Sequence, residues 1–353
     1  MTHVLTGGDF HEGSGDGNGW TNPEGLPDSH NSIYPTPAPH KGYLDESNYC
    51  SPFQPQDIAE LFAESEEDVP WIYRGFLVRG GLTVLAGDPK VGKSTYAYEL
   101  IERIALGEEF LGEAVTEEKV LLLGLEEHRR DMIARLRRRS EEALKGRVKV
   151  VCGQLPFSPK IHMEIADYIM REDIGLVVID TIPAWWNLKD ENDASEVLKK
   201  GYPFLNVIRG TNAAWLGLAH TRKSGGGHGS DIRGSSAFVG LVDIAVSMKR
   251  TQSGGNQRML EAVSRYDDTP NNLVIEYAEG CYRKLGSPQD MASLAKTNKV
   301  WEALTPEGKT IDQLAKETDL SKQDVSRALQ SLGDQVHREG GGHRGDPYLF
   351  SRN

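Results

Sequence analysis

The stretch that decides the fold reads Gly87-Asp88-Pro89-Lys90-Val91-Gly92-Lys93-Ser94-Thr95. It fits the pattern G-x-x-x-x-G-K-[ST], the P-loop. The apolar run at 81–86 is typical of a buried strand, and residues 94–105 follow with helical periodicity. A strand, a glycine-rich turn and a helix N-terminus together suit a phosphate, because backbone N–H groups and the helix dipole face the anion.

The residue types in this stretch predict its ligand. Lys93 would reach the β- and γ-phosphates of a nucleotide, and the Ser94 hydroxyl would bind Mg²⁺. The alternative is a chance match in a glycine-rich turn, which does not account for the strand and the helix on its two sides. We therefore expect residues 87–95 to bind a nucleoside triphosphate, with ATP and Mg²⁺ as the cofactors.

Length and charge suggest three parts. The chain has 353 residues, enough for one large domain and a small one, and a formal net charge of −12. Residues 1–55 contain seven acidic residues and one lysine, so half of the net charge lies there. They are rich in Gly, Pro, Asn and Ser and poor in apolar side chains, which predicts a disordered acidic tail. Basic surface elsewhere can still contact a phosphate backbone.

No feature of the sequence indicates a membrane. No apolar run approaches the ~20 residues that span a bilayer, and the N-terminus lacks the basic and apolar regions of a signal peptide. Cys50, Cys152 and Cys281 are widely spaced and form no metal-ligand pattern. Three isolated thiols suit a reducing compartment. We therefore expect a cytoplasmic protein with no membrane partner.

Apolar strands alternate with amphipathic helices from residue 71 to about residue 285. This alternation is typical of an α/β fold with a mostly parallel central sheet. A short helix is expected at 57–62, and a longer helix is expected at 129–144, after the second strand. The strand candidates are 82–86, 119–124, 148–151, 175–180, 213–219 and 242–248.

Two of these strands end in acidic residues. Asp180 ends an apolar strand about ninety residues after the P-loop, where Walker B strands place the carboxylate that holds Mg²⁺. Glu126 and Glu127 follow the strand at 119–124, where a carboxylate can face the γ-phosphate and take a proton from attacking water. Glu126 is the expected base and Glu127 the reserve. The alternatives are that Asp180 caps a turn and that both glutamates only open the next helix.

Two further strands end in polar residues. His220 follows the strand at 213–219 and is placed to sense the γ-phosphate, although a lone histidine is as often structural. Lys249 and Arg250 follow the strand at 242–248 and could reach the γ-phosphate bound by a neighbouring subunit, as arginine fingers do.

The loop at 221–236 is rich in glycine and carries three cations, Arg222, Lys223 and Arg233. Spaced cations on such a loop suit a polyanion such as single-stranded DNA. The alternative is an ordinary surface loop.

The order and spacing of five segments between 71 and 285 resemble the RecA-type ATPases, and most of all the branch that contains the plasmid RepA replicative helicases. The segments read GLTVLAGDPKVGKST, LLLGLEE, LVVIDTI, LGLAHTRK and RGSSAFVGLVDIAV. The resemblance implies a RecA-like ATPase domain at 56–287 that hydrolyses ATP. By the same resemblance Glu126 is the catalytic base, Asp180 supports Mg²⁺ and His220 senses the γ-phosphate.

The resemblance also implies an assembly. In the family, the loop after the residue that matches His220 lines the central channel of a ring of subunits, so we expect a homo-oligomer, a hexameric ring, with single-stranded DNA as partner. Family members often carry two consecutive histidines where this chain has Ala219 and His220. Trp185 and Trp186 precede an acidic loop and could stack on bases or pack at a subunit contact.

The C-terminal part, 290–353, resembles a winged helix-turn-helix domain. A first helix would end near 300–304, a second would cover 310–318, and a recognition helix would follow Ser321 as its N-cap. Val325, Leu329 and Leu332 would point inward, and Lys322 and Arg327 would be presented to DNA. A Gly-rich hairpin would form the wing. Nine cations balance nine acids over 294–353, so duplex DNA and a protein remain alternative partners.

These features together predict an ATP-hydrolysing DNA motor, a ring-forming replicative helicase that acts on single-stranded DNA. Two alternatives stay open. One is a DNA-binding regulator in which ATP only switches oligomerisation, and the other is a recombination mediator that does not unwind DNA.

Overall fold

The computed structural model describes residues 55–63, 68–187, 193–220, 236–251 and 255–353. The chain divides into two units, residues 1–66 and 67–353. In the first unit the described residues contain helix α1 (Ile58–Ala63), close to the helix predicted at 57–62. The predicted disordered tail lies outside the described residues, apart from residue 55. None of the described helices is long and apolar enough to cross a membrane.

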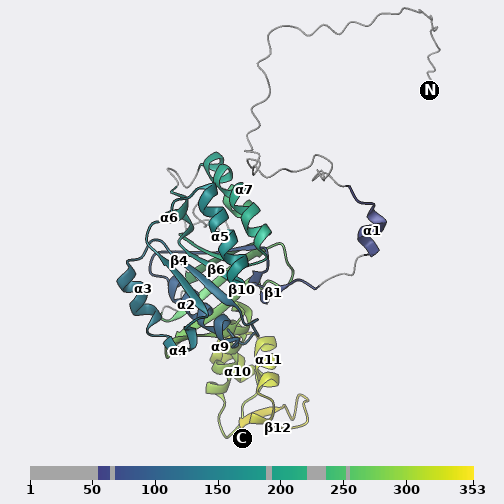
Figure 1. Ribbon diagram of the computed structural model, residues 1–353. Helices are drawn as coiled ribbons and strands as arrows, with labels where there is room; N and C mark the ends of the chain where they lie inside the picture. The colour runs from purple at the N-terminus through teal and green to yellow at the C-terminus, as the bar shows by residue number, and fades with distance from the viewer. Residues whose placement is uncertain (1–54, 64–67, 188–192, 221–235, 252–254) are drawn as a thin grey trace, which may run out of the picture. The chain divides into compact units, whose positions relative to one another are not determined.

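The second unit is built around a nine-stranded sheet with the order β11-β10-β9-β8-β3-β7-β6-β4-β5 (Figure 1). The six strands from β8 to β5 pair in parallel, and β9, β10 and β11 extend the sheet by antiparallel pairing. This is the mostly parallel α/β fold that the sequence predicts. The parallel strands are β3 (Leu82–Gly87), β4 (Lys119–Gly124), β5 (Val148–Cys152), β6 (Ile174–Asp180), β7 (Ala214–His220) and β8 (Ile244–Arg250).

All six predicted strands are present, each displaced by no more than two residues. They are recognisable because parallel strands are covered on both faces and therefore form continuous apolar runs. Every residue of β3 and of β6 is buried. The antiparallel strands were not predicted: β9 (Gln257–Ser264), β10 (Asn272–Ala278) and β11 (Cys281–Gly286). A short hairpin of β1 (Trp71–Tyr73) and β2 (Leu77–Val78) precedes the sheet.

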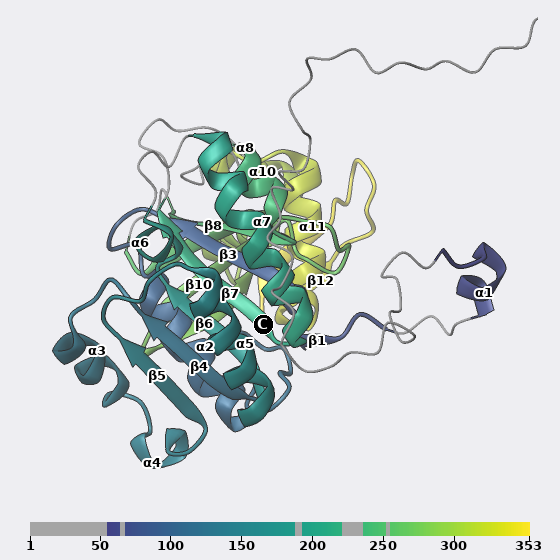
Figure 2. The same ribbon diagram turned by 45° about the horizontal axis from the view of Figure 1, so that its top comes forward.

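Helices cover both faces of the sheet (Figure 2). Helix α2 (Lys93–Leu106) packs on one face, in a hydrophobic core that includes Leu100, Ile101 and Ile104. The other core contains residues of α5 (Pro159–Glu172), α6 (Ile182–Trp186), α7 (Ala194–Thr211) and α8 (Ser236–Leu241). The register sets Gly87 opposite His220 and Gly124 opposite Asp180. The carboxyl ends of four parallel strands therefore meet at one edge.

The single helix predicted at 129–144 is wrong. The structure has two helices, α3 (Arg129–Leu136) and α4 (Glu141–Leu144). The break arises because Glu102 of α2 binds the junction: its carboxylate pairs with Arg139 at 3.1 Å and accepts the backbone N–H of Ser140 at 2.9 Å. Ser140 is thereby held in an extended conformation as the N-cap of α4.

The C-terminal residues form α9 (Pro288–Ala303), α10 (Ile311–Thr318), α11 (Lys322–Leu332) and a hairpin of β12 (Val336–Glu339) and β13 (Leu349–Arg352). Ser321 caps α11 by accepting the N–H of Asp324 at 3.1 Å. Val325, Leu329 and Leu332 are buried, as predicted. Helix α9 begins at Pro288, slightly before the predicted domain boundary at 290. The assignment of these elements to a winged helix stays a prediction.

Candidate active site

The P-loop connects β3 to α2 at the edge where the parallel strands end. The turn uses two left-handed residues, Lys90 at φ 62° and Gly92 at φ 120°. Gly92 is the N-cap of α2, and no side chain caps this 14-residue helix. Uncapped N–H groups at a helix N-terminus, together with the helix dipole, bind an anion. The loop is therefore built to receive a phosphate.

Two glycines of the loop are required by close contacts. A Cβ on Gly87 would lie 2.7 Å from the carbonyl oxygen of Met248 and 2.8 Å from a methyl group of Val91. A Cβ on Gly92 would collide with the hydroxyl of Tyr282. The P-loop backbone thus packs directly against β8 and β11, and larger residues would push it out of place.

Lys93 supplies a cation inside the loop. Lys93 is only 7% exposed, and its Nζ donates to the carbonyl oxygens of Gly87 at 2.8 Å and Asp88 at 3.1 Å. The ammonium group is thus already held within the loop by backbone oxygens. From this position it can turn to a phosphate oxygen without rearrangement of the backbone.

Asp180 ends β6 and is almost fully buried. The pKa of Asp180 is raised to about 6, mainly by burial and to a smaller extent by the carboxylates of Glu126 and Glu127, while a hydrogen bond from Ser94 opposes the shift. A hydroxyl beside a carboxylate is a pair of Mg²⁺ ligand types, and a cation there would relieve the repulsion between the carboxylates. The residues present therefore fit the magnesium ion that the sequence predicts.

The described residues contain no group of three or more His, Cys, Asp or Glu side chains that could hold a metal ion by themselves.

Glu126 lies directly after β4 and beside the end of β6. The backbone N–H groups of Leu125 and Glu126 both donate to the carbonyl oxygen of Asp180, at 2.8 and 3.2 Å. Thr181 donates its hydroxyl to one carboxylate oxygen of Glu126 at 2.6 Å, and Nε2 of His220 lies 3.6 Å from the other. The contact with His220, more than any other, lowers the pKa of Glu126 to about 2. Glu126 is therefore an oriented, ionised carboxylate.

Glu127, the reserve base, faces a different partner. One of its oxygens lies 2.9 Å from Nε of Arg135 on α3. Its side chain is 21% exposed, whereas that of Glu126 is 49% exposed. Glu126 is the more exposed of the two and is held by Thr181 and His220, whereas Glu127 is paired with an arginine, which favours Glu126 as the base.

The structure brings together five predicted residues, and adds one that the sequence analysis missed. The five are Lys93, Ser94, Glu126, Asp180 and His220, which come from the ends of three strands, β4, β6 and β7, and from the start of α2. Thr181 was missed. The only signal for it was a hydroxyl directly after the Walker B strand. The buried Nδ1 of His220 has no hydrogen-bond partner among the described residues.

Lys249 and Arg250, the candidate arginine-finger residues, bind groups of their own chain. Lys249 pairs with Glu261 at 2.8 Å, and Arg250 donates to the carbonyl oxygen of Lys90 at 2.9 Å. A role in a neighbouring subunit would require both to leave these partners. The loop residues Arg222, Lys223 and Arg233 lie outside the described residues.

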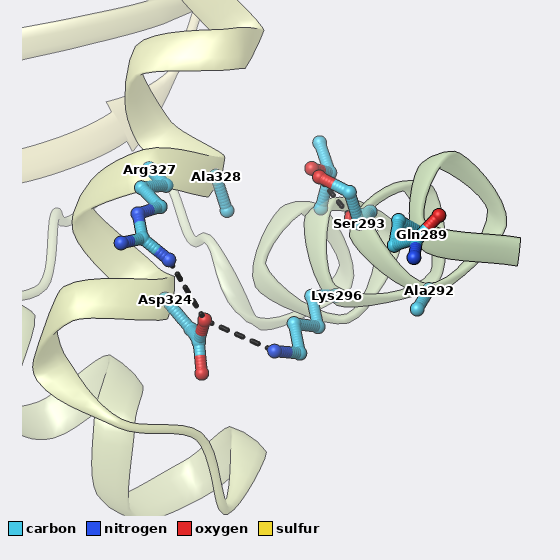
Figure 3. Close-up of a pocket in the computed structure, with 8 residues that line it drawn as sticks. Gln289, Ala292, Ser293, Lys296, Asp324, Arg327 and Ala328 are labelled. Atoms are coloured by element: carbon cyan, nitrogen blue, oxygen red, sulfur yellow. Dashed lines mark hydrogen bonds and ion pairs between the residues drawn. The ribbon is translucent and has the colours of Figure 1, made fainter. Parts of the chain in front are cut away.

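The candidate DNA contacts of α11 form ion pairs with nearby acids. Lys322 lies 2.8 Å from Asp312 of α10. Arg327 lies 3.9 Å from Asp324, which also pairs with Lys296 of α9 at 3.0 Å. Figure 3 shows Lys296 and Arg327 converging on Asp324 across a small pocket between α9 and α11. Both candidates remain more than half exposed, at 69% and 67%.

The two tryptophans are buried in the hydrophobic core. Trp185 and Trp186 are 2% and 1% exposed, inside the core beside α5 and α7. Their rings lie 5.2 and 5.7 Å from the ring of Phe157, and both also contact Phe204. The suggestions that they stack on bases or pack at a subunit contact are therefore wrong.

Comparison with known proteins agrees with this site. The profile of the AAA domain family matches residues 49–226, which include the P-loop, Glu126, Asp180 and His220. The DNA repair protein RadA of Chlamydia pneumoniae is 23% identical over 231 residues, which cover 64% of this chain and 46% of that protein. The chain thus spans about half the length of this curated relative. Both findings support a RecA-like P-loop ATPase.

Proposed function

This chain belongs to the AAA domain family, and from that premise we propose that it is an ATP-hydrolysing motor, a ring-forming replicative helicase that acts on single-stranded DNA. The observation that carries the hydrolytic part is the ionised Glu126, held by Thr181 and His220 beside the buried Asp180. The similarity to a protein named for DNA repair supports DNA as the partner.

Each side chain has a part in hydrolysis. The P-loop N–H groups and Lys93 would bind the phosphates, and Ser94 and Asp180 would hold Mg²⁺, which would supply positive charge to the phosphate oxygens. Glu126 accepts the proton of the attacking water, which its oriented carboxylate can do without a change of backbone. Thr181 and His220 keep that carboxylate in place.

The parts of the proposal that concern assembly rest on the sequence. Arg222, Lys223 and Arg233 would contact single-stranded DNA in the channel of a hexameric ring. Lys249 and Arg250 would act on the nucleotide of the next subunit. The helices α9 to α11 and their hairpin would form a winged helix that contacts duplex DNA or a protein.

A second candidate is a recombination mediator or an ATP-switched DNA-binding regulator. The mediator is favoured by the similarity to a protein named for DNA repair, and the regulator is favoured by helix α11 with its exposed Lys322 and Arg327. In either case ATP would control assembly on DNA and no strand would be displaced.

The test is the ATPase rate of the full chain with and without single-stranded DNA, with the size of the ATP-bound assembly. We expect stimulation by DNA and a ring-sized complex. The triple variant Arg222→Ala, Lys223→Ala, Arg233→Ala should lose the stimulation and keep basal activity. Each lost phosphate contact should reduce the slope of log affinity against log salt by about 0.7.

The double variant Lys322→Ala, Arg327→Ala is the matched control, because it removes two exposed cations from α11 and should leave the stimulation intact. If the control loses DNA binding and the loop variant keeps it, the regulator is the better account. A monomer at saturating ATP would contradict the ring.

A further inference from the structure

Side chains of β8, β9 and β11 reach three consecutive carbonyl groups of the P-loop. Arg250, at the end of β8, donates to Lys90 O at 2.9 Å. Arg258, on β9, donates through Nε to Val91 O at 2.6 Å, and the Tyr282 hydroxyl, on β11, donates to Gly92 O at 3.3 Å. We call Arg250, Arg258 and Tyr282 the P-loop clamp.

Arg258 is the centre of the clamp. The residue is 9% exposed, and its guanidinium also donates to the carbonyl oxygens of Gly255 at 3.0 Å and Gln257 at 2.8 Å. Within the described part of the chain it has no ion pair with a carboxylate. Burial and the nearby Arg250 lower the pKa of Arg258. A buried cation that binds only carbonyl groups is costly unless its hydrogen bonds are well made.

The clamp also sets two like charges against each other. Arg250 and Arg258 are directly opposite in the antiparallel pairing of β8 and β9. Like charges at opposed positions of a sheet destabilise it. The arrangement therefore lowers the stability of the sheet. It also places two guanidinium groups against the backbone of the ligand-binding loop.

Tyr282 is anchored to the helix that follows the P-loop. Its backbone N–H donates to the carboxylate of Glu99, at 2.9 and 3.1 Å, and Glu99 is a buried residue of α2. Its ring lies 5.7 Å from that of Tyr96, also on α2. The missing side chain of Gly92 makes room for its hydroxyl. Strand β11 is thus attached to α2 at two points, one of them inside the P-loop.

Because of peptide geometry, these contacts with carbonyl oxygens also orient N–H groups of the P-loop. In a trans peptide the C=O of one residue and the N–H of the next point in opposite directions. A donor on the carbonyl oxygens of Lys90, Val91 and Gly92 therefore orients the N–H groups of Val91, Gly92 and Lys93. The N–H of Val91 donates to the carbonyl oxygen of Asp88 at 3.2 Å and closes the turn, and the N–H groups of Gly92 and Lys93 belong to the part of the loop that receives the phosphates.

We propose that the P-loop clamp, and Arg258 and Tyr282 above all, are positioning residues that preorganise the P-loop for nucleotide binding. In this role Arg258 and Tyr282 act through the backbone of the loop, not by contact with the nucleotide or the attacking water. A preorganised loop binds its ligand more tightly because less ordering is left for the binding step. The inference rests on the proposed function, because it assumes that the loop binds a nucleotide.

The test measures MgATP and MgADP affinity by calorimetry, with KM and kcat for ATP. Arg258→Met should weaken both affinities about tenfold and raise KM equally, the size expected for a lost charged hydrogen bond. Arg258→Lys, which keeps the charge and one donor, should recover part of the loss. Tyr282→Phe, which removes only the hydroxyl, should weaken binding about two- to threefold. In all three, kcat should change by less than about twofold, since Glu126 is untouched.

Arg265→Met is the matched control. Arg265 directly follows β9, pairs with Asp243 at 3.4 Å and donates to the carbonyl oxygen of Gly240 at 3.3 Å. The Arg265→Met variant should leave nucleotide affinity unchanged. A control as weak in binding as Arg258→Met, or a fall in kcat at constant KM, would overturn the inference.

The failures are separable. If the wild-type chain binds no MgATP, the proposed function itself is wrong. If it binds, and Arg258→Met and Tyr282→Phe bind equally well, only the clamp is wrong. Should Arg258→Met fail to fold, Tyr282→Phe decides alone, and unchanged affinity in that variant rejects the clamp.

Discussion

The parallel and antiparallel halves of the sheet contribute to the site in different ways. The parallel strands β4, β6 and β7 deliver reactive side chains at their carboxyl ends, Glu126, Asp180 and His220. The antiparallel strands contact the P-loop backbone through the sides of β9 and β11, at Arg258 and Tyr282. The two halves thus have different roles. The ends of the parallel strands carry the side chains that act on the substrate, and the antiparallel strands hold the loop that binds it.

The largest effect should come from the parallel half. Glu126→Gln keeps the shape of the site and removes the base, so ATP should still bind but be hydrolysed at least about 100-fold more slowly. Lys93→Ala should instead weaken ATP binding, because it removes the cation held within the loop. Nucleotide affinity and single-turnover rates separate the two. Near-normal turnover by Glu126→Gln would point to Glu127 as the base. It would also contradict the assignment of the chemistry to the end of β4.

A smaller effect is expected for Thr181, which orients Glu126 through a 2.6 Å hydrogen bond. Thr181→Val should slow hydrolysis about tenfold at unchanged ATP affinity, the loss of one hydrogen bond to a charged group. Thr211→Val is the control, because Thr211 is equally buried and its hydroxyl binds Ile208 O at 3.0 Å, within α7. If both variants slow turnover alike, the effect is a general one on packing and Thr181 has no special part.

A weaker effect concerns pH and magnesium. Since burial raises the pKa of Asp180 to about 6, the carboxyl binds a proton below that pH and must lose it to ligate Mg²⁺. Lowering the pH from about 7.5 to about 5.5 should therefore raise the Mg²⁺ concentration for half-maximal activity roughly fourfold. Asp180→Asn, assayed by Mg²⁺-dependent nucleotide binding, should lose this dependence. A flat profile in the wild type would remove Asp180 from the metal site.

The smallest effect tests how the extension is anchored. Glu99→Gln leaves one acceptor for the N–H of Tyr282, so the free energy of unfolding should fall by about 1 kcal/mol and nucleotide affinity should fall slightly with it. Glu102→Gln, on the same helix, keeps one acceptor for Arg139 or Ser140 but loses its charge, and should destabilise the chain without weakening nucleotide binding. Denaturant titration and calorimetry measure both. Equal nucleotide affinity in the two variants would mean that β11 is not linked to the P-loop through α2.

The two halves also differ in how well they could be predicted. The strands β3 and β6 are buried at every position, and such runs are visible in the sequence. Strand β9 alternates buried and partly exposed residues over Gln257–Ser264, and its place in the sheet depends on pairing with β8. The break between α3 and α4 was missed for the same reason, because a distant carboxylate, Glu102, causes it.

The residues of the site also differ in how well they could be predicted from the sequence. Lys93, Glu126 and Asp180 could be predicted because each follows a recognisable strand or motif. The role of Thr181 depends on the register that sets the ends of β4 and β6 side by side. Arg258 lies 167 residues from its P-loop partner and Tyr282 lies 190 from its own, distances over which no local pattern carries information.

The central claim, that this chain is a DNA motor, is tested most directly by strand displacement. The substrate is a labelled duplex with a single-stranded tail, offered separately with a 3′ and a 5′ tail. The account predicts that the wild-type chain releases the labelled strand from one of them with hydrolysable ATP, and that Glu126→Gln, which binds ATP, releases none. DNA-stimulated hydrolysis by the wild type without release from either substrate would contradict it, and would identify the chain as a switch or a mediator.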